Sequence, residues 1–188
     1  MKTGVRLGVF VASTVALLGQ AKPKDVDGWD KVKWGMTLAE VRSVYTSRTS
    51  EESPGRAAEC SDVPVHYCVP DRGPHIDLLD PVEIGDIKMD ATVQAGYGST
   101  KVVSVQLADL AGALRSGNGI RDFDTLKMLL IQKYGTPANQ ETKKDEIGAH
   151  VTTVLWAFPS TAILLSLREE TVIYLEYKAA DKKALDKL

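Results

Sequence analysis

The feature that most constrains this fold is a long strand pattern between Ile84 and Tyr97. From Ile87 onward every second residue is apolar, and the residues between them are Lys88, Asp90, Thr92 and Gln94. A period of two is typical of a strand that buries one face and exposes the other. Residues 98–101 predict a hairpin turn, and residues 102–107 predict the returning strand. We therefore expect an antiparallel sheet with one face in a core and the other open to water.

A short helix is predicted after Trp34. Thr37 and, three residues later, Glu40 form a capping box, and apolar residues then recur at helical spacing as far as about Ser47. We expect this segment to bury a single face, made of Trp34, Leu38, Val41, Val44 and Tyr45.

A second helix is predicted to begin at Asp122 or Asp124 and to end at Gly135, which a proline follows two residues later. After a polar loop at residues 138–148, three strands are expected over residues 150–158, 162–168 and 172–177. This order predicts an α+β fold in which helices pack on one face of an antiparallel sheet. It also raises the hypothesis of two helix-then-strands repeats.

The first 21 residues have the layout of a secretory signal peptide. Lys2 and Arg6 give a positive start, residues 7–18 carry no charge, and Gly19 and Ala21 are small residues at the spacing that a signal peptidase requires. The apolar run is shorter than the roughly 20 residues of a membrane-spanning helix, although an uncleaved anchor is an alternative. We expect a signal peptide at 1–21, a single domain at 22–188, and a periplasmic or secreted location without a stable membrane anchor after cleavage.

The charge of the exported part argues against several classes of partner. The whole chain has 23 Lys and Arg against 25 Asp and Glu, and cleavage after Ala21 removes Lys2 and Arg6. The remaining domain therefore has a net charge of about −4. Such a mildly acidic surface does not predict binding to nucleic acid or to anionic lipid.

Only two cysteines occur, Cys60 and Cys68, and both lie in the exported part. In an oxidising compartment, a close pair of this kind is most simply a disulfide. Free thiols and a metal site are the alternatives, but zinc prefers four ligands, and this spacing with His66 between the cysteines is not a standard zinc pattern.

The sequence has no strong catalytic motif. It lacks the Gly-x-Ser-x-Gly turn, the phosphate-binding loop and the His-Glu-x-x-His helix. One segment, Asp71 to Asp86, gathers side chains that could hold a divalent cation or form an ordinary solvated loop: Asp71, His75, Asp77, Asp80, Glu83 and Asp86. We predict that the protein is not an enzyme and has no cofactor. Trp34 and Trp156 are expected in the core, whereas the pattern leaves the burial of Trp29 open.

Three short pieces carry a resemblance to known proteins: residues 34–37 (Trp-Gly-Met-Thr), residues 134–137 (Tyr-Gly-Thr-Pro) and Trp156. This layout resembles small exported bacterial proteins of the β-lactamase inhibitory protein type and the small lipoprotein of the outer-membrane assembly machine. The resemblance implies an α+β fold and a function in protein contact. The chain lacks the lipid-bearing cysteine of that lipoprotein.

These observations favour an exported, non-enzymatic module that binds another envelope protein. The expected contact surface is the open face of the predicted sheet, with Lys88, Asp90, Thr92, Gln94 and Tyr97. A small secreted hydrolase is an alternative that would need His66, His75 or His150 to converge with a carboxylate. A carrier with an apolar cavity is another.

Mass spectrometry of non-reduced protein from its native compartment tests the export and disulfide predictions. The mature chain should lack residues 1–21, and its mass should be about two hydrogens below that of the reduced form. Recovery of Met1 on a cytoplasmic form would contradict the signal peptide. Two freely alkylated thiols would contradict the disulfide.

Overall fold

The computed structural model describes residues 25–46, 48–55, 59–61, 67–69, 73–109 and 118–180, with the backbone alone at 59–61 and 67–69. The predicted signal peptide therefore lies outside the described residues, as do His66, Asp71 and the last eight residues. The described helices are α1 (Leu38–Val44) and α3 (Gly119–Tyr134). The strands are β1 (Gly28–Trp29), β2 (Val32–Lys33), β3 (Glu59–Ser61), β4 (Tyr67–Val69), β5 (His75–Asp77), β6 (Val82–Ile84), β7 (Ile87–Ala95), β8 (Val102–Ala108), β9 (Asn139–Lys144), β10 (His150–Ala157), β11 (Thr161–Arg168) and β12 (Val172–Ala179).

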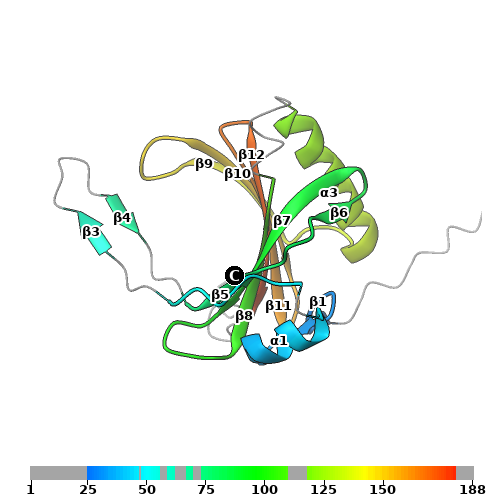
Figure 1. The fold of residues 1–188 in the computed structure, drawn as a ribbon. Coiled ribbons are helices and arrows are strands. Elements are labelled where there is room, and N and C mark those ends of the chain that lie inside the picture. Colours follow the sequence, from blue (N-terminus) through cyan, green and yellow to red (C-terminus); the bar gives the residue numbers. More distant parts are fainter. Residues whose placement is uncertain are drawn as a thin grey trace, which may run out of the picture.

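One eight-stranded antiparallel sheet organises the fold. Its strand order is β5-β7-β8-β12-β11-β10-β9, and β6 pairs with β7 beside this path. Strands β9 to β12 form a meander, in which each strand pairs with the next one along the chain. β12 also pairs with β8, although the segment that contains α3 and β9 to β11 separates these two strands in the sequence. The pairing of β8 with β12 therefore unites the strands before and after α3 in a single sheet (Figure 1).

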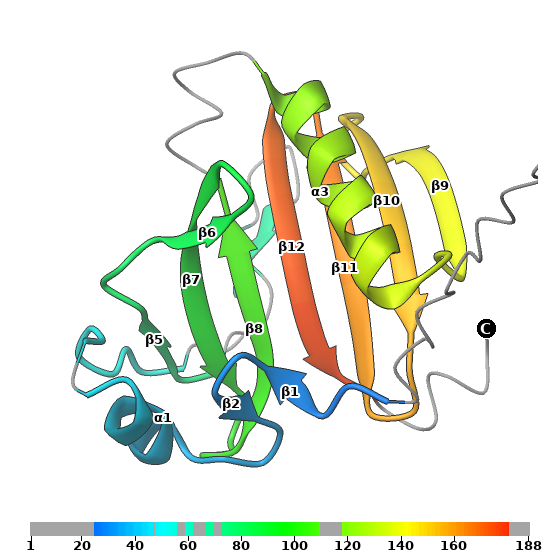
Figure 2. The same ribbon diagram turned by 90° about the vertical axis from the view of Figure 1, so that its right-hand side faces the viewer.

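The two faces of this sheet have different surroundings. One face carries buried apolar side chains from every long strand, including Val93, Leu107, Leu175 and Leu165, and α3 lies against it over β11 and β12 (Figure 2). Phe123, Leu126, Leu130 and Tyr134 form the buried stripe of α3. The helix packs closely, because a Cβ atom on Gly119 would lie 2.3 Å from the carbonyl oxygen of Glu170. The core therefore lies between this face and the segments that contain α1, α3 and the β1–β2 hairpin.

The predicted α+β class is wrong, because the protein has a β-rich fold. Among the residues that the structure describes, 47% lie in strands and 18% in helices, and the two described helices are too short to form a layer over the sheet. The sequence patterns did not predict β1, β2 and β9, for two physical reasons. β9 exposes nearly all of its residues as a polar edge strand, so it shows no alternation. β1 and β2 have only two residues each, too few for a period to appear.

The hypothesis of two helix-then-strands repeats belongs to the same contradicted prediction. The strands that follow α1 and those that follow α3 do not form separate units, because β8 and β12 are paired along their length. The helix boundaries also differ from expectation. The N-cap of α3 is Asn118, four residues before Asp122, because residues 119–121 continue the helix toward the turn between β11 and β12.

The backbone brings the two cysteines opposite each other. β3 and β4 are antiparallel, and their register pairs Cys60 directly with Cys68. Directly opposed residues have Cβ atoms about 4.5–5.5 Å apart, which is close to the separation that a disulfide needs. The thiols lie outside the described part of the chain, so the disulfide stays a prediction.

The capping box of α1 is confirmed: the Glu40 amide donates to the Thr37 hydroxyl, and the Thr37 amide donates to the Glu40 carboxylate. Leu38 and Val41 are buried in the core, and Trp34 and Tyr45 are partly buried against it. Val44 does not belong to this face, because its side chain is 37% exposed. Neither described helix has the length and the apolar content to cross a membrane.

The position of α1 predicts unequal effects for the same substitution at Val41 and at Val44, which lie on different sides of the helix. Val41→Asp would place an unpaired charge in the core and should lower the free energy of unfolding by on the order of 3 kcal/mol. Val44→Asp, on the exposed side of the same helix, should change it by less than about 0.5 kcal/mol. Urea unfolding of both variants measures the difference, and equal effects would contradict the packing of α1.

Candidate functional site

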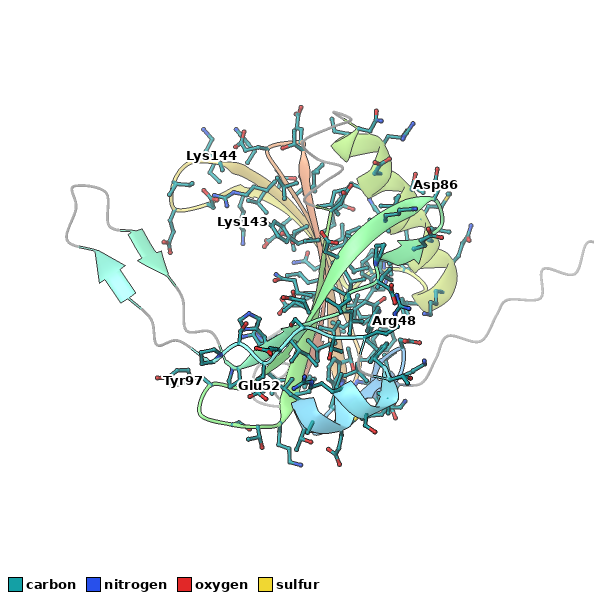
Figure 3. All side chains as sticks on the ribbon, in the orientation of Figure 1. Arg48, Glu52, Asp86, Tyr97, Lys143 and Lys144 are labelled. Atoms are coloured by element: carbon teal, nitrogen blue, oxygen red, sulfur yellow. The ribbon has the colours of Figure 1, made fainter. Side chains whose placement is uncertain are left out.

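The predicted contact residues of β7 lie together on the face of the sheet away from the core. Lys88 and Asp90 are exposed, and Thr92 and Gln94 are half-buried, whereas the residues between them are buried. Tyr97 lies in the turn between β7 and β8 and is 58% exposed (Figure 3). The structure thus groups the four strand residues and places Tyr97 at the end of their hairpin.

The strand register shows which other side chains share this face. Thr92 pairs with Gln106, Gln106 with Glu176, and the same row continues through β11 and β10. From one edge to the other the row reads Asp77, Thr92, Gln106, Glu176, Leu164, Leu155 and Asn139. Side chains of one row in an antiparallel sheet point to the same side. We call the surface formed by this row and its neighbouring rows the open face.

Polar contacts on the open face are few near β7. The Thr92 hydroxyl donates to a carboxylate oxygen of Asp77 at 2.6 Å. Lys88 and Glu83 form an ion pair at 3.3 Å, but both side chains are more than 60% exposed. Because exposed ion pairs contribute little to stability, Lys88 remains available to a partner.

The open face becomes apolar toward β10 and β11. Leu164 and Leu155 are directly paired, and Tyr174 lies on the same face of β12. All three are half-buried, although no described helix lies over them (Figure 1). The predicted polar surface is therefore only one end of an amphipathic surface. The sequence did not predict the apolar end, because it depends on the register between strands that are distant along the chain.

The residues considered for catalysis or metal binding are dispersed. His75 lies in β5 and His150 begins β10, with β7, β8, β12 and β11 between them. Asp77 accepts from Thr92, and Asp80 pairs with Arg48. Within the part of the chain that the structure describes, no three His, Cys, Asp or Glu side chains are grouped so that they could hold a metal ion.

A second candidate site lies on the core side of the sheet, at its end near α1. It is an open cleft of about 810 Å³ between the β1–β2 hairpin, the end of α1, the segment 78–82 and the end of α3. Its walls contain three aromatic residues, Trp29, Tyr45 and Tyr134. Its charged residues are Asp25, Asp27, Asp30, Asp80, Lys31, Arg48 and Lys133.

Hydrogen bonds from β11 and its preceding turn hold one wall of this cleft. The Thr161 hydroxyl is fully buried; it accepts from the Trp34 indole N–H at 2.6 Å and donates to the Val26 carbonyl. The amide and hydroxyl of Ser160 both donate to the Asp25 carboxylate, at 2.9 and 2.6 Å. The segment that contains Asp25 and Val26 is thus fixed to β11 and its preceding turn as a structural part of the cleft.

The opposite side of the cleft is organised around Tyr45. Its hydroxyl donates to a carboxylate oxygen of Asp30 at 2.7 Å, and the Lys31 ammonium lies 5.3 Å from the centre of its ring. Partial burial, followed by the contact with Asp30, raises the pKa of Tyr45 above its ordinary value. Tyr45 therefore stays a neutral hydrogen-bond donor at physiological pH.

Two carboxylates of the cleft have lowered pKa values. The Ser160 hydroxyl holds the pKa of Asp25 below its ordinary value, and the hydrogen bond from Lys33 does the same for Asp27. Both groups are therefore charged acceptors near neutral pH.

The backbone is also unusual at two lining residues, since Asp30 and Thr46 adopt left-handed φ angles of 48° and 53°. Such conformations in residues other than glycine concentrate in turns and at functional sites.

Sequence reasoning did not predict this cleft. Its lining comes from short turns and element ends, where no hydrophobic period reveals which side chains meet. One signal was present, namely a tryptophan beside Gly28 in a polar segment. Trp29 is partly buried, with its ring centre 6.4 Å from that of Tyr177.

Comparisons of this chain with family models, with curated proteins and with solved structures find no match. The resemblance in layout to the β-lactamase inhibitory protein type consequently stays a prediction.

The buried Thr161 hydroxyl gives a test of how the cleft wall is held. Thr161→Val keeps the side-chain shape but leaves Trp34 and Val26 without their partner, so it should lower the free energy of unfolding by about 2 kcal/mol. Thr153→Val, on the open face of β10, is the matched control and should change it by less than about 0.5 kcal/mol. Urea unfolding measures both, and equal losses would contradict a special role for Thr161.

Proposed function

We propose that this chain is an exported, non-enzymatic module that binds another envelope protein through the open face. The observation that carries the proposal is the amphipathic row from Thr92 to Leu155, which lies across the sheet with no described helix over it. An antiparallel sheet can leave one face to water, but that face is then normally polar. Half-buried leucines on the open face indicate a surface that a partner can cover.

The arrangement of side chains defines the kind of partner that would fit. Leu155, Leu164 and Tyr174 would form the apolar centre of the contact, and Lys88, Asp90 and Gln94 would form part of its polar rim. Protein interfaces commonly combine an apolar centre that contains aromatic residues with a hydrated polar rim. A partner would therefore present a small apolar patch surrounded by hydrogen-bonding and charged groups.

The alternative functions have less support. A hydrolase would need a histidine and a carboxylate in one pocket, but neither His75 nor His150 lines the cleft described above. An apolar-ligand carrier would need a void between the sheet and α3. Large buried side chains, among them Trp156, Leu126 and Tyr134, occupy that region instead. Location outside the cytoplasm rests on the signal-peptide pattern and is part of the proposal.

Site-specific photo-cross-linking in the native envelope tests the proposal. A photoreactive residue at Thr92 should cross-link to one discrete protein, whereas the same group at Met128, exposed on α3 behind the sheet, should not. Lys88→Glu combined with Gln94→Arg should reduce the cross-linked product at least about tenfold, because charge and shape change at the rim while the core does not.

Lys127→Glu on α3 provides a matched charge reversal away from the open face and should leave the product unchanged. Melting temperatures of all variants must remain close to that of the parent for the comparison to hold. Equal cross-linking from Thr92 and Met128, or no effect of the double variant, would contradict binding through the open face. A hydrolytic activity that His75→Ala abolishes would contradict the non-enzymatic part of the proposal.

A further inference from the structure

The cleft between α1, the β1–β2 hairpin and the end of α3 has walls in which positive and negative charges are balanced. Four aspartates and three cationic side chains line it, and one of these aspartates, Asp27, pairs with Lys33 at 2.6 Å. Arg48 pairs with Asp80, and both residues line the cleft. The cleft therefore has no excess of either sign that would select a ligand by net charge.

Several of these groups keep hydrogen-bonding capacity. Lys31 and Lys133 lie over the rings of Tyr45 and Tyr134, and neither has an ion-pair partner among the described residues. An ammonium group has three donors, and a carboxylate such as Asp30 can accept more bonds than the single one from Tyr45. Donors and acceptors thus face the same space.

This mixture limits the chemistry of the ligand. A simple anion can satisfy only the donors of the walls, and a simple cation only the acceptors. A hydroxyl group donates and accepts at once, so a ligand with many hydroxyls can satisfy both kinds. An extended peptide usually pairs its backbone with a strand edge, whereas most of this lining consists of turns, helix ends and side chains.

The aromatic residues and the size of the cleft point in the same direction. Trp29 and Tyr45 are partly buried and contribute ring surface together with a polar group, which suits a ligand with both C–H surfaces and hydroxyls. A volume of about 810 Å³ lies within the range of sites that hold molecules larger than a single small metabolite. The position on the core side of the sheet separates this cleft from the open face.

We propose that the cleft binds a short neutral oligosaccharide, with Trp29 and Tyr45 as stacking surfaces and with Asp30, Lys31 and Lys133 as hydrogen-bonding groups.

Calorimetric titration of the mature protein tests this proposal with chitotetraose, cellotetraose and maltotetraose. At least one should bind with a Kd of about 1 mM or lower. It should also change the tryptophan fluorescence of the parent but not that of Trp29→Phe. Tetragalacturonate, the fully deacetylated form of chitotetraose and tetra-alanine serve as anionic, cationic and peptide comparators.

Tyr45→Ala should raise the Kd at least about tenfold because it removes a stacking surface. Lys133→Ala tests the same site at an exposed position and should also weaken binding, even if Tyr45→Ala fails to fold. Asp30→Ala removes an acceptor of the cleft and should also raise the Kd. Lys144→Ala, an exposed lysine of β9, should bind like the parent.

Three results would overturn the proposal. The first is no binding of any neutral tetrasaccharide. The second is tighter binding of a charged comparator or of tetra-alanine than of all three neutral sugars. The third is parental affinity in Lys133→Ala and in every folded Tyr45 variant.

Discussion

The pairing of β8 with β12 is the constraint on which the rest of this structure depends. Leu107 lies opposite Leu175, and both are fully buried although α3 and three strands separate them along the chain. Without this pairing, β8 and β12 would each be an unpaired strand edge, and each part of the sheet would expose part of its apolar face. Closing so long a segment costs conformational entropy, which the continuous core behind all the long strands must offset.

Because all the long strands belong to one sheet, their pairing also fixes which residues of each strand point to the core and which point to the open face. Because side chains alternate with a period of two, a slip of one residue between β8 and β12 would move the side chains of one part to the opposite face. Val105 and Leu107 could not then remain in the core together with Ile173 and Leu175. The open face is therefore defined by the same register that fills the core, and Glu176 and Leu164 belong to it for that reason.

Local patterns predicted the elements whose environment is set nearby. The alternation from Ile87 to Ala95 matches β7, and the capping box at Thr37 matches the start of α1. The pairing of β8 with β12 and the apolar end of the open face depend on contacts between distant segments, so no local period could reveal them. The cleft escaped prediction because β1 and β2 are two-residue strands whose position depends on Thr161, more than 100 residues away.

β11 connects the two candidate surfaces physically. Its odd-numbered side chains point to the core side, where Thr161 holds the Trp34 and Val26 segment that builds one wall of the cleft. Its even-numbered side chains, including Leu164, point to the open face. A shift of this strand along its axis would disturb the anchor of the cleft and the apolar row at the same time. β12 and β10 flank β11 along nearly its full length, and this pairing opposes such a shift. Each surface can then act on a preformed scaffold, which lowers the cost of ordering on binding.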